Sequence, residues 1–308
     1  MSENKKTIAI SVGDINGIGI ELALKNHHLV KELCNPIYCI NEPLLKQASE
    51  LLEFPIPDEF TLFATYSDFP IKAGKVSKKS GIFSYLSFLN AISIVKKGKA
   101  DGICTLPINK ESWKKAGIHY VGHTDMLRDI FKMDAIMMLG CEEMFVALFT
   151  EHIPLKDVAK KIKKEKLTQF FDDFYQSETP QKVAVLGLNP HAGDNGVLGN
   201  EEKEITKAIN KINKKLGKEI FFGPFVPDTI FTKDARKNFK YFIAMYHDQG
   251  LAPLKALYFE EGINVSLNLP IKRTSVDHGT AFDKAYKKGN NLSNLSYINA
   301  IKKLTAGI

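Results

Sequence analysis

Short apolar runs alternate along the chain with longer segments in which apolar residues recur every three or four positions. The runs are typical of buried strands, and the longer segments are typical of helices with one buried face. The strands predicted in this way are residues 7–12, 36–40, 102–106, 135–139, 145–150, 183–188, 241–246 and 264–267. The predicted helices are residues 20–33, 43–52, 81–97, 155–175, 201–216 and 294–305. Strands that alternate with helices indicate an α/β fold on a mostly parallel sheet.

The segment between Phe54 and Gly81 breaks this pattern, and no element is predicted there. The length of 308 residues exceeds the roughly 100–200 typical of one domain, so we expect two domains or one large α/β unit. An apolar share of 44% and a charged share of 25% are ordinary for a soluble globular protein.

The net charge is +7, from 42 lysines and arginines against 35 acidic residues. Most of the excess is lysine scattered over helix-like segments such as residues 160–166. This favours a solvated face, which could help attract a small phosphorylated or carboxylated substrate, over a nucleic-acid surface, where arginines and aromatics concentrate.

The cysteines show no Cys-x-x-Cys spacing and are too few for a disulfide framework. They are Cys34, Cys39, Cys104 and Cys141.

The first residues lead straight into a strand pattern without a signal-peptide apolar region, and no stretch approaches about 18 uninterrupted apolar residues. We therefore expect a cytoplasmic protein with reduced thiols and no membrane contact.

Three histidines follow the ends of three predicted strands. They are His152, His191 and His247, after strands 145–150, 183–188 and 241–246. Because the carboxyl ends of parallel strands share one edge of a sheet, the imidazoles could meet there and hold a divalent metal. No short-range ligand motif supports this, so three unrelated loop histidines remain the alternative. His247, followed by Asp248, could also cap a polar turn.

The turn after the first predicted strand is rich in glycine. Gly13, Gly17 and Gly19 have the spacing G-x-x-x-G-x-G, which differs from the dinucleotide fingerprint G-x-G-x-x-G, so a Rossmann nucleotide site is not supported. A ligand site at a helix N-terminus and a plain tight turn both fit this turn.

Two later loops carry groups suited to ligands. Residues 189–202 contain three glycines and end in acidic residues typical of a helix start, so this loop could fold over a ligand. Residues 270–283 bring cationic, hydroxyl and histidine groups into a predicted loop. Its Arg273, with Lys255 and His123, would suit a phosphate, because arginine offers a bidentate fork and lysine a mobile charge.

Together, these segments resemble the 4-hydroxythreonine-4-phosphate dehydrogenase family, the PdxA proteins of pyridoxal phosphate biosynthesis. The matching blocks are residues 11–21, 122–125, 150–155, 188–202, 226–229, 244–255 and 262–283, in family order. The first turn departs from the family pattern, because Ile15, Asn16 and Ile20 stand where Pro, Ala and Pro are usual. Losing two prolines relaxes φ in that turn.

The resemblance implies the fold of isocitrate and isopropylmalate dehydrogenases, in which two α/β/α domains surround a central cleft, rather than a Rossmann fold. It implies a discontinuous domain of residues 1–122 plus 250–308 with the cofactor loop. The second domain, residues 123–249, would carry the metal ligands and dimer contacts. The implied assembly is a homodimer whose active site is completed across the interface.

The resemblance also assigns roles position by position. It implies that His152, His191 and His247 bind a divalent metal, which could be zinc, cobalt, magnesium or manganese; three imidazoles favour the softer ions. The residues implied to bind substrate are His123, Thr124, Lys255, Asn264 and Arg273. Those implied to contact NAD or NADP are His278, Gly279, Thr280 and Asp283, with Gly193 and Gly196 as a further contact. Asp228 and Asp248 are alternative candidates for the catalytic base or for orienting the metal ligands.

The implied reaction is oxidation of 4-phosphooxy-L-threonine by a nicotinamide cofactor to 2-amino-3-oxo-4-phosphooxybutanoate. That product decarboxylates to 3-amino-2-oxopropyl phosphate in the synthesis of pyridoxine 5'-phosphate. The nearest alternative is a related dehydrogenase of threonate or erythronate 4-phosphate. A metal-binding protein without catalysis and a phosphate-binding transferase are alternatives from other classes. The transferase would leave the cofactor-like loop 277–283 unexplained.

Overall fold

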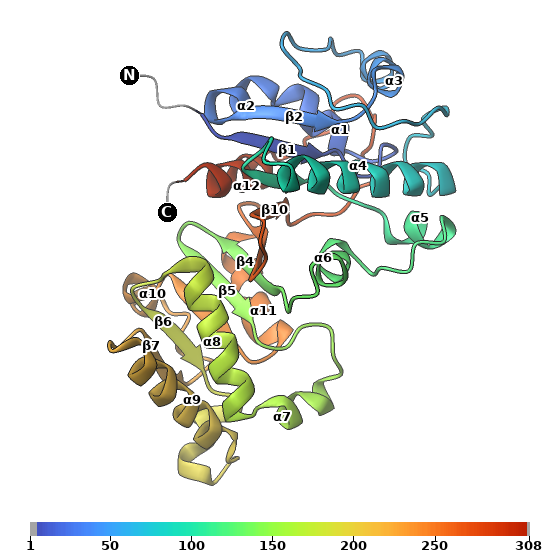
Figure 1. Cartoon of the computed structure of the whole chain (residues 1–308). Helices are drawn as coiled ribbons and strands as arrows, with labels where there is room; N and C mark the ends of the chain where they lie inside the picture. The colour runs from blue at the N-terminus through green and yellow to red at the C-terminus, as the bar shows by residue number, and fades with distance from the viewer. Residues whose placement is uncertain (1–4, 307–308) are drawn as a thin grey trace. The chain divides into compact units, whose positions relative to one another are not determined.

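The computed structural model describes residues 5–306 of the chain, which form two compact units. Unit 1 contains the described residues up to Lys132 and those from Leu269 onward, and unit 2 is Met133–Asn268. Both units combine strands with helices, so the α/β prediction is confirmed (Figure 1).

Unit 1 is built on four strands in the order β2-β1-β3-β10, and every neighbouring pair is parallel. Their bounds are β1 Thr7–Ser11, β2 Asn35–Cys39, β3 Gly102–Thr105 and β10 Arg273–Val276. The helices are α1 Gly19–Lys25, α2 His27–Leu33, α3 Glu42–Leu52, α4 Lys78–Lys96, α5 Lys110–Lys115, α6 His123–Phe131 and α12 Leu295–Thr305.

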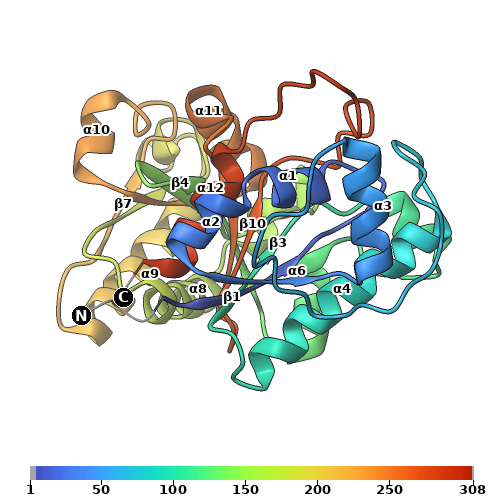
Figure 2. The same ribbon diagram turned by 90° about the horizontal axis from the view of Figure 1, so that it is seen from above.

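The strands of unit 1 bury both faces, because successive side chains point to opposite sides of a sheet. Ala9 and Ile103 pack on one side with Phe88 of α4, Trp113 of α5 and Leu127 of α6. Helices α12 and α2 contact the strands and each other (Figure 2). Unit 1 therefore has helices on its sheet as the α/β/α expectation requires.

Unit 2 has six strands in the order β9-β4-β5-β8-β6-β7. Their bounds are β4 Ile136–Cys141, β5 Met144–Leu148, β6 Val183–Leu186, β7 Phe221–Phe225, β8 Tyr241–Ala244 and β9 Ile263–Leu267. Strand β4 runs antiparallel to both of its neighbours, whereas β5, β8, β6 and β7 are parallel to one another. The sheet is therefore mixed.

The helical segments of unit 2 are η1 Leu155–Asp157, α7 Val158–Lys161, α8 Lys164–Glu178, η2 Pro190–Gly196, α9 Glu201–Leu216, α10 Lys233–Asn238 and α11 His247–Tyr258. Helix α11 lies directly against β5 and β8. Gly250 allows this close approach, because a Cβ there would lie 2.4 Å from Val146 Cγ1 and 2.8 Å from the Ala244 Cβ.

Several sequence-based expectations differ from the structure. Residues 273–276, for which the sequence predicts a loop, form β10, and residues 247–258, for which it predicts no helix and offers a polar turn at His247-Asp248 as one reading, form α11. Residues 20–33 and 155–175 were each expected as one helix. The first is divided at Asn26, and the second at the extended residue Lys163. Strand β7 and helices α5, α6 and α10 were not predicted.

The two compact units divide the chain at different residues from the expected domain boundaries, 122/123 and 249/250. The boundaries lie after Lys132 and after Asn268. The reason is packing: Leu127 of α6 belongs to the core of unit 1, whereas Leu251 and Leu254 of α11 belong to the core of unit 2. Among residues 5–306, no helix is long and apolar enough to cross a membrane.

Candidate functional site

The three histidines expected to bind metal follow three adjacent, parallel strands of unit 2. The strands lie in the order β5-β8-β6, so their carboxyl ends share one edge. His152 follows β5, His247 follows β8 and His191 follows β6. The expected common edge is therefore present.

The structure brings His152 and His247 together. Their ring centroids are 5.5 Å apart, a separation that one ion could span, because zinc–nitrogen bonds are about 2.0–2.1 Å long and each ring adds its own radius. His152 is exposed, and 37% of the His247 side chain remains exposed. Both rings are therefore accessible to an ion from solvent.

Asp248 orients the His247 ring. Its Oδ1 lies 2.7 Å from His247 Nδ1, which leaves Nε2 as the nitrogen available to a metal. A carboxylate behind a ligating imidazole is the usual arrangement in protein metal sites, because it fixes the ring and its tautomer. Two imidazoles of the kind that a divalent ion needs therefore lie together at this edge.

His191 lies apart from this pair. In the part of the chain that the structure describes, no group of three or more His, Cys, Asp or Glu residues is placed to hold one ion. His191 is exposed and begins a run of five residues with left-handed backbone, His191–Asn195, with φ between 42° and 80°. Its role as a third ligand stays a prediction.

Gly193 and Gly196, the expected second cofactor contact, belong to the same turn and have φ values of 80° and 98°. Gly193 is buried, and a Cβ there would lie 2.5 Å from Glu202 Oε2. This glycine lets the turn fold against α9. Nothing in the geometry tests the cofactor contact.

In unit 1, three of the expected substrate residues lie at the ends of neighbouring elements. Arg273 begins β10, and His123 and Thr124 begin α6. Arg273 is only 2% exposed, and its Nη2 and Nε donate to Thr105 Oγ1 over 2.7 and 3.2 Å. Burial lowers the pKa of Arg273 to about 10, so the guanidinium still carries its charge near neutral pH.

The His123 ring packs edge-on against Phe88, with ring centroids 4.6 Å apart. The residue is only partly buried overall, but its Nε2 is enclosed and has no hydrogen-bond partner among residues 5–306. Burial, together with the charge of Arg273, holds the His123 pKa well below its usual range. A neutral imidazole, a desolvated guanidinium and the N-terminus of α6 are a donor set suited to an anion.

The other two expected substrate residues belong to unit 2. Lys255 lies on α11, with Nζ 5.8 Å from the centroid of the Phe259 ring. Asn264 lies on β9, and its buried Oδ1 has no hydrogen-bond partner among the described residues. An enclosed acceptor without a donor is costly in isolation, so a ligand donor would satisfy it.

The expected cofactor loop packs on the glycine-rich first turn, and both belong to unit 1. The Ile18 amide donates to the Thr280 carbonyl over 3.1 Å, and Tyr286 donates to the Ile15 carbonyl over 2.7 Å. A Cβ on Gly17 would lie 2.8 Å from the Thr280 oxygen. Residues 11–20 are all buried, so the first turn supports the loop.

The remaining cofactor residues differ in exposure. Burial lowers the pKa of His278, whose Nε2 has no hydrogen-bond partner within residues 5–306, while Gly279 and Asp283 are exposed. Of the two candidate bases, Asp228 is exposed in the turn after β7, and Asp248 contacts His247.

Sequence reasoning missed the function of Asn16. Its side chain accepts from the Lys72 amide over 2.9 Å and donates to the Lys75 carbonyl over 2.7 Å. The Gly74 amide also donates to the Asn16 carbonyl over 2.8 Å. Asn16 therefore holds residues 72–75 in place, within the segment between Phe54 and Gly81 for which no element is predicted. Its departure from the family's usual Ala was the available signal.

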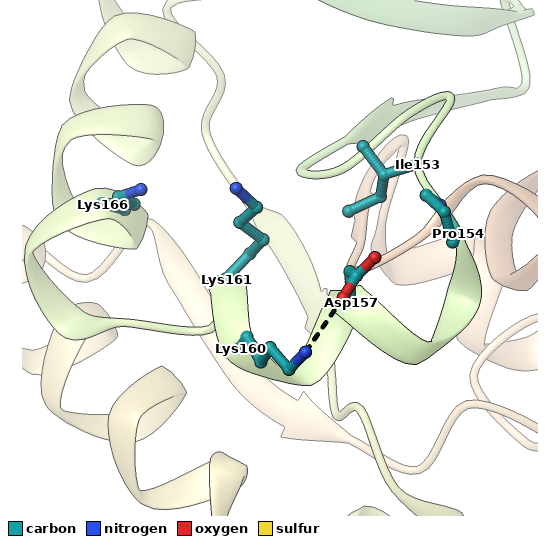
Figure 3. A pocket seen from close by; sticks show the side chains of 6 residues that line it. All are labelled: Ile153, Pro154, Asp157, Lys160, Lys161 and Lys166. Carbon is teal, nitrogen blue, oxygen red and sulfur yellow. Dashed lines mark hydrogen bonds and ion pairs between the residues drawn. The ribbon is translucent and has the colours of Figure 1, made fainter.

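Residues that closely follow His152 in the sequence line a cavity of about 360 Å³. Its lining residues are Ile153, Pro154, Asp157, Lys160, Lys161 and Lys166 (Figure 3). Lys160 pairs with Asp157 over 3.1 Å. The other two lysines extend from α7 and α8 and are exposed, as expected for a solvated basic face.

Comparison with known proteins shows which family the chain resembles over nearly its whole length. The sequence profile of the family "Pyridoxal phosphate biosynthetic protein PdxA" matches residues 32–304. The chain is 63% identical to the 4-hydroxythreonine-4-phosphate dehydrogenase of Sulfurimonas denitrificans, over 98% of both chains. It is 59% identical to the protein of that name from Campylobacter fetus, over 96% of both. The crystal structure of a 4-hydroxythreonine-4-phosphate dehydrogenase from Burkholderia phymatum superposes with a TM-score of 0.80 at 31% identity, covering 98% of each chain.

Proposed function

Because the chain belongs to the PdxA family of pyridoxal phosphate biosynthetic proteins, we propose that it oxidises 4-phosphooxy-L-threonine with NAD or NADP and a divalent metal ion. The product would be 2-amino-3-oxo-4-phosphooxybutanoate, a β-keto acid that loses CO₂ to give 3-amino-2-oxopropyl phosphate. The observation that carries the metal part is the pair His152 and His247 with Asp248 behind it.

A nicotinamide cofactor, when bound, would supply the acceptor for the C3–H hydride, and a side chain of the protein would take the hydroxyl proton. A divalent ion, when bound by His152, His247 and a third imidazole, supplies Lewis acidity that favours loss of this proton. Asp248 fixes the orientation of His247, so we assign it the orienting role and leave Asp228 as the candidate base. Zinc or cobalt suits an imidazole set better than magnesium does.

The remaining candidate residues would bind the phosphorylated substrate and the nicotinamide cofactor. Arg273, His123 and Thr124 supply donors for the phosphate, and Lys255 and Asn264 supply a charge and an acceptor from unit 2. His278, Gly279, Thr280 and Asp283 would contact the cofactor, with the buried first turn as support. Gly193 and Gly196 are a further candidate contact.

The test is the absorbance of reduced cofactor on mixing the protein with NAD or NADP and substrate, with Co²⁺ or Zn²⁺ or after chelation. We expect a signal with 4-phosphooxy-L-threonine and metal. A signal only with threonate or erythronate 4-phosphate would identify the related dehydrogenase instead. Full activity after metal removal would contradict the metal assignment.

We also infer a cytoplasmic homodimer whose site is completed by the partner copy. Supporting this inference, His191 does not join His152 and His247 in one described chain. If the site is shared, His191→Asn and His247→Asn proteins should each be inactive, and mixing them should restore about a quarter of the activity through hybrid dimers. Mixtures that stay inactive while forming dimers, as measured by light scattering, would contradict a shared site.

A further inference from the structure

We propose that Gln249, together with Thr150 and Glu202, forms a hydrogen-bonded frame that sets the positions of the three candidate metal-binding histidines. None of these three side chains is a candidate ligand. Each holds the backbone from which a histidine projects, so they are positioning residues. The inference rests on the metal site proposed above and adds the residues that would make its geometry precise.

The frame is needed because strand pairing ends before the histidines begin. The last paired residues are Leu148 with Ala244 between β5 and β8, and Val185 with Ile243 between β6 and β8. Backbone hydrogen bonds still join β5 to β8 as far as Thr150 and Met245, but they stop two residues before His152 and His247. We infer that buried side chains supply the remaining restraint on each histidine-bearing segment, because metal ligands tolerate only small errors in position.

Gln249 joins the end of β8 to the end of β6. Its Oε1 accepts from the Met245 amide over 2.7 Å, and its Nε2 donates to the Gly187 carbonyl over 2.7 Å. Since an amide N–H can only donate and a carbonyl can only accept, these partners fix the orientation of the side-chain amide. The residue is only 9% exposed, so both bonds are shielded from water.

Thr150 joins the end of β5 to the same residue of β8. Its Oγ1 donates to the Met245 carbonyl over 2.6 Å, and its backbone amide donates to that oxygen over 3.2 Å. Met245 is therefore held on both sides, by Gln249 through its N–H and by Thr150 through its C=O. Thr150 precedes His152 by two residues, and Met245 precedes His247 by two.

Glu202 holds the segment that leads from β6 to His191. Its Oε1 accepts from the Leu188 amide over 2.9 Å and from the Asn189 amide over 2.8 Å, and its Oε2 accepts from Asn189 Nδ2 over 3.0 Å. The residue is 8% exposed. A buried carboxylate that accepts three N–H groups is strongly held in place, since hydrogen bonds to a charged acceptor are among the strongest in proteins.

These contacts connect the three histidine-bearing segments in one series. Thr150 is linked to Met245, Met245 to Gln249, and Gln249 to Gly187, next to the amides held by Glu202. Loss of a residue that orients a metal ligand typically costs 10–100-fold in metal affinity. We expect that cost when any member of the frame is removed, although none touches the ion.

The test uses Co²⁺, whose visible absorption reports the geometry of its ligands. Gln249→Met removes both hydrogen bonds at nearly constant volume, and Gln249→Glu keeps the acceptor but removes the donor to Gly187. We expect both variants to bind Co²⁺ roughly 10–100-fold more weakly than wild type and to shift its spectrum. Thr150→Val should act in the same direction, and Thr150→Ser, which keeps the hydroxyl, should restore wild-type binding.

Gln47→Met is the matched control. Gln47 makes the same pair of backbone contacts in unit 1, accepting from the Ile71 amide over 3.2 Å and donating to the Phe69 carbonyl over 3.3 Å. This variant should lose thermal stability without changing Co²⁺ affinity or spectrum. For Glu202→Gln, the control is Glu204→Gln, a partly exposed residue of α9 that pairs with Lys207.

The outcomes separate the two proposals. If wild-type protein shows no histidine-type Co²⁺ spectrum, the metal part of the proposed function fails, and the frame fails with it. If wild type binds Co²⁺ but folded Gln249 and Thr150→Val variants bind it equally well with the same spectrum, the frame alone is overturned. Loss of binding in Gln47→Met to the same extent would also overturn it, because the effect would then be general destabilisation.

Discussion

The candidate substrate-binding residues of unit 1 are largely enclosed by protein, whereas the candidate metal ligands of unit 2 are open to solvent. Arg273 is 2% exposed and Thr124 is 7% exposed, and His123 has an enclosed ring nitrogen. His152 and His191 are exposed, and the His247 side chain is 37% exposed. The two proposed sites therefore differ in how far their residues are exposed.

The difference in exposure matches the proposed roles of the two sets, anion binding in unit 1 and metal binding in unit 2. A buried guanidinium has lost water and gains strongly when an anion arrives, and a buried imidazole stays neutral and available as a donor or acceptor. Metal ligands need no such burial, because the ion itself supplies the charge. What they need is fixed spacing, and in unit 2 the buried polar groups lie behind the histidines.

The largest effect should come from His247→Asn, which removes a candidate ligand from the exposed set. We expect Co²⁺ affinity to fall by more than the roughly 100-fold that loss of an orienting residue costs, and turnover to be lost. Isothermal titration with Co²⁺ and the cofactor absorbance assay measure these. His119→Asn, an exposed histidine of unit 1, is the control and should behave as wild type. If His247→Asn bound Co²⁺ as tightly as wild type, His247 would not be a metal ligand, and the comparison of the two units would lose its basis.

A smaller effect should come from Arg273→Lys in the buried set. Lysine keeps the charge but loses the rigid fork that contacts Thr105 and would meet a phosphate. We expect the KM for phosphorylated substrate to rise about tenfold, equivalent to about 1.4 kcal/mol, with little change in the KM for cofactor. Arg236→Lys, a partly buried arginine of unit 2, is the matched control. Equal rises in both KM values would argue against a phosphate contact.

The smallest effect should appear as a pH dependence of stability. Because the pKa of His123 is lower in the folded protein than in the unfolded chain, the unfolded chain binds more protons below about pH 6.5, and acidification favours unfolding. Between pH 7.5 and 5.5 we therefore expect His123 to contribute a loss in the free energy of unfolding. Urea unfolding at both pH values should show a smaller loss in His123→Asn. The same loss in both proteins would mean that His123 is freely protonated in the fold.

The sequence predicted the strands that bear the three histidines, because β5, β6 and β8 are continuous apolar runs buried on both faces. It missed β7 and β10 for physical reasons. Strand β7 contains Gly223 and Pro224, which usually indicate a turn. Strand β10 consists of Arg273, Thr274, Ser275 and Val276, whose burial depends on neighbours distant in sequence.

The candidate site shows the same limit. The start of α11 carries Gly250, and Pro253 lies inside the helix, so local signals favoured a loop although packing against β5 and β8 makes a helix. The residues named for chemistry could be found from motifs. Gln249 and Glu202 could not, because their importance lies in partners that only the folded chain brings near.

The left-handed run His191–Asn195 has a consequence for motion in the native state. Four of its five residues carry a Cβ, and for each of them the left-handed backbone conformation is roughly 1–2 kcal/mol higher in free energy than the right-handed one. Glu202 holds Leu188 and Asn189, which lead into the run. Once those contacts open, the segment has no intrinsic tendency to return to the same shape. Its amides should therefore exchange with deuterium by local opening, long before those of β6 and β8 exchange through global unfolding.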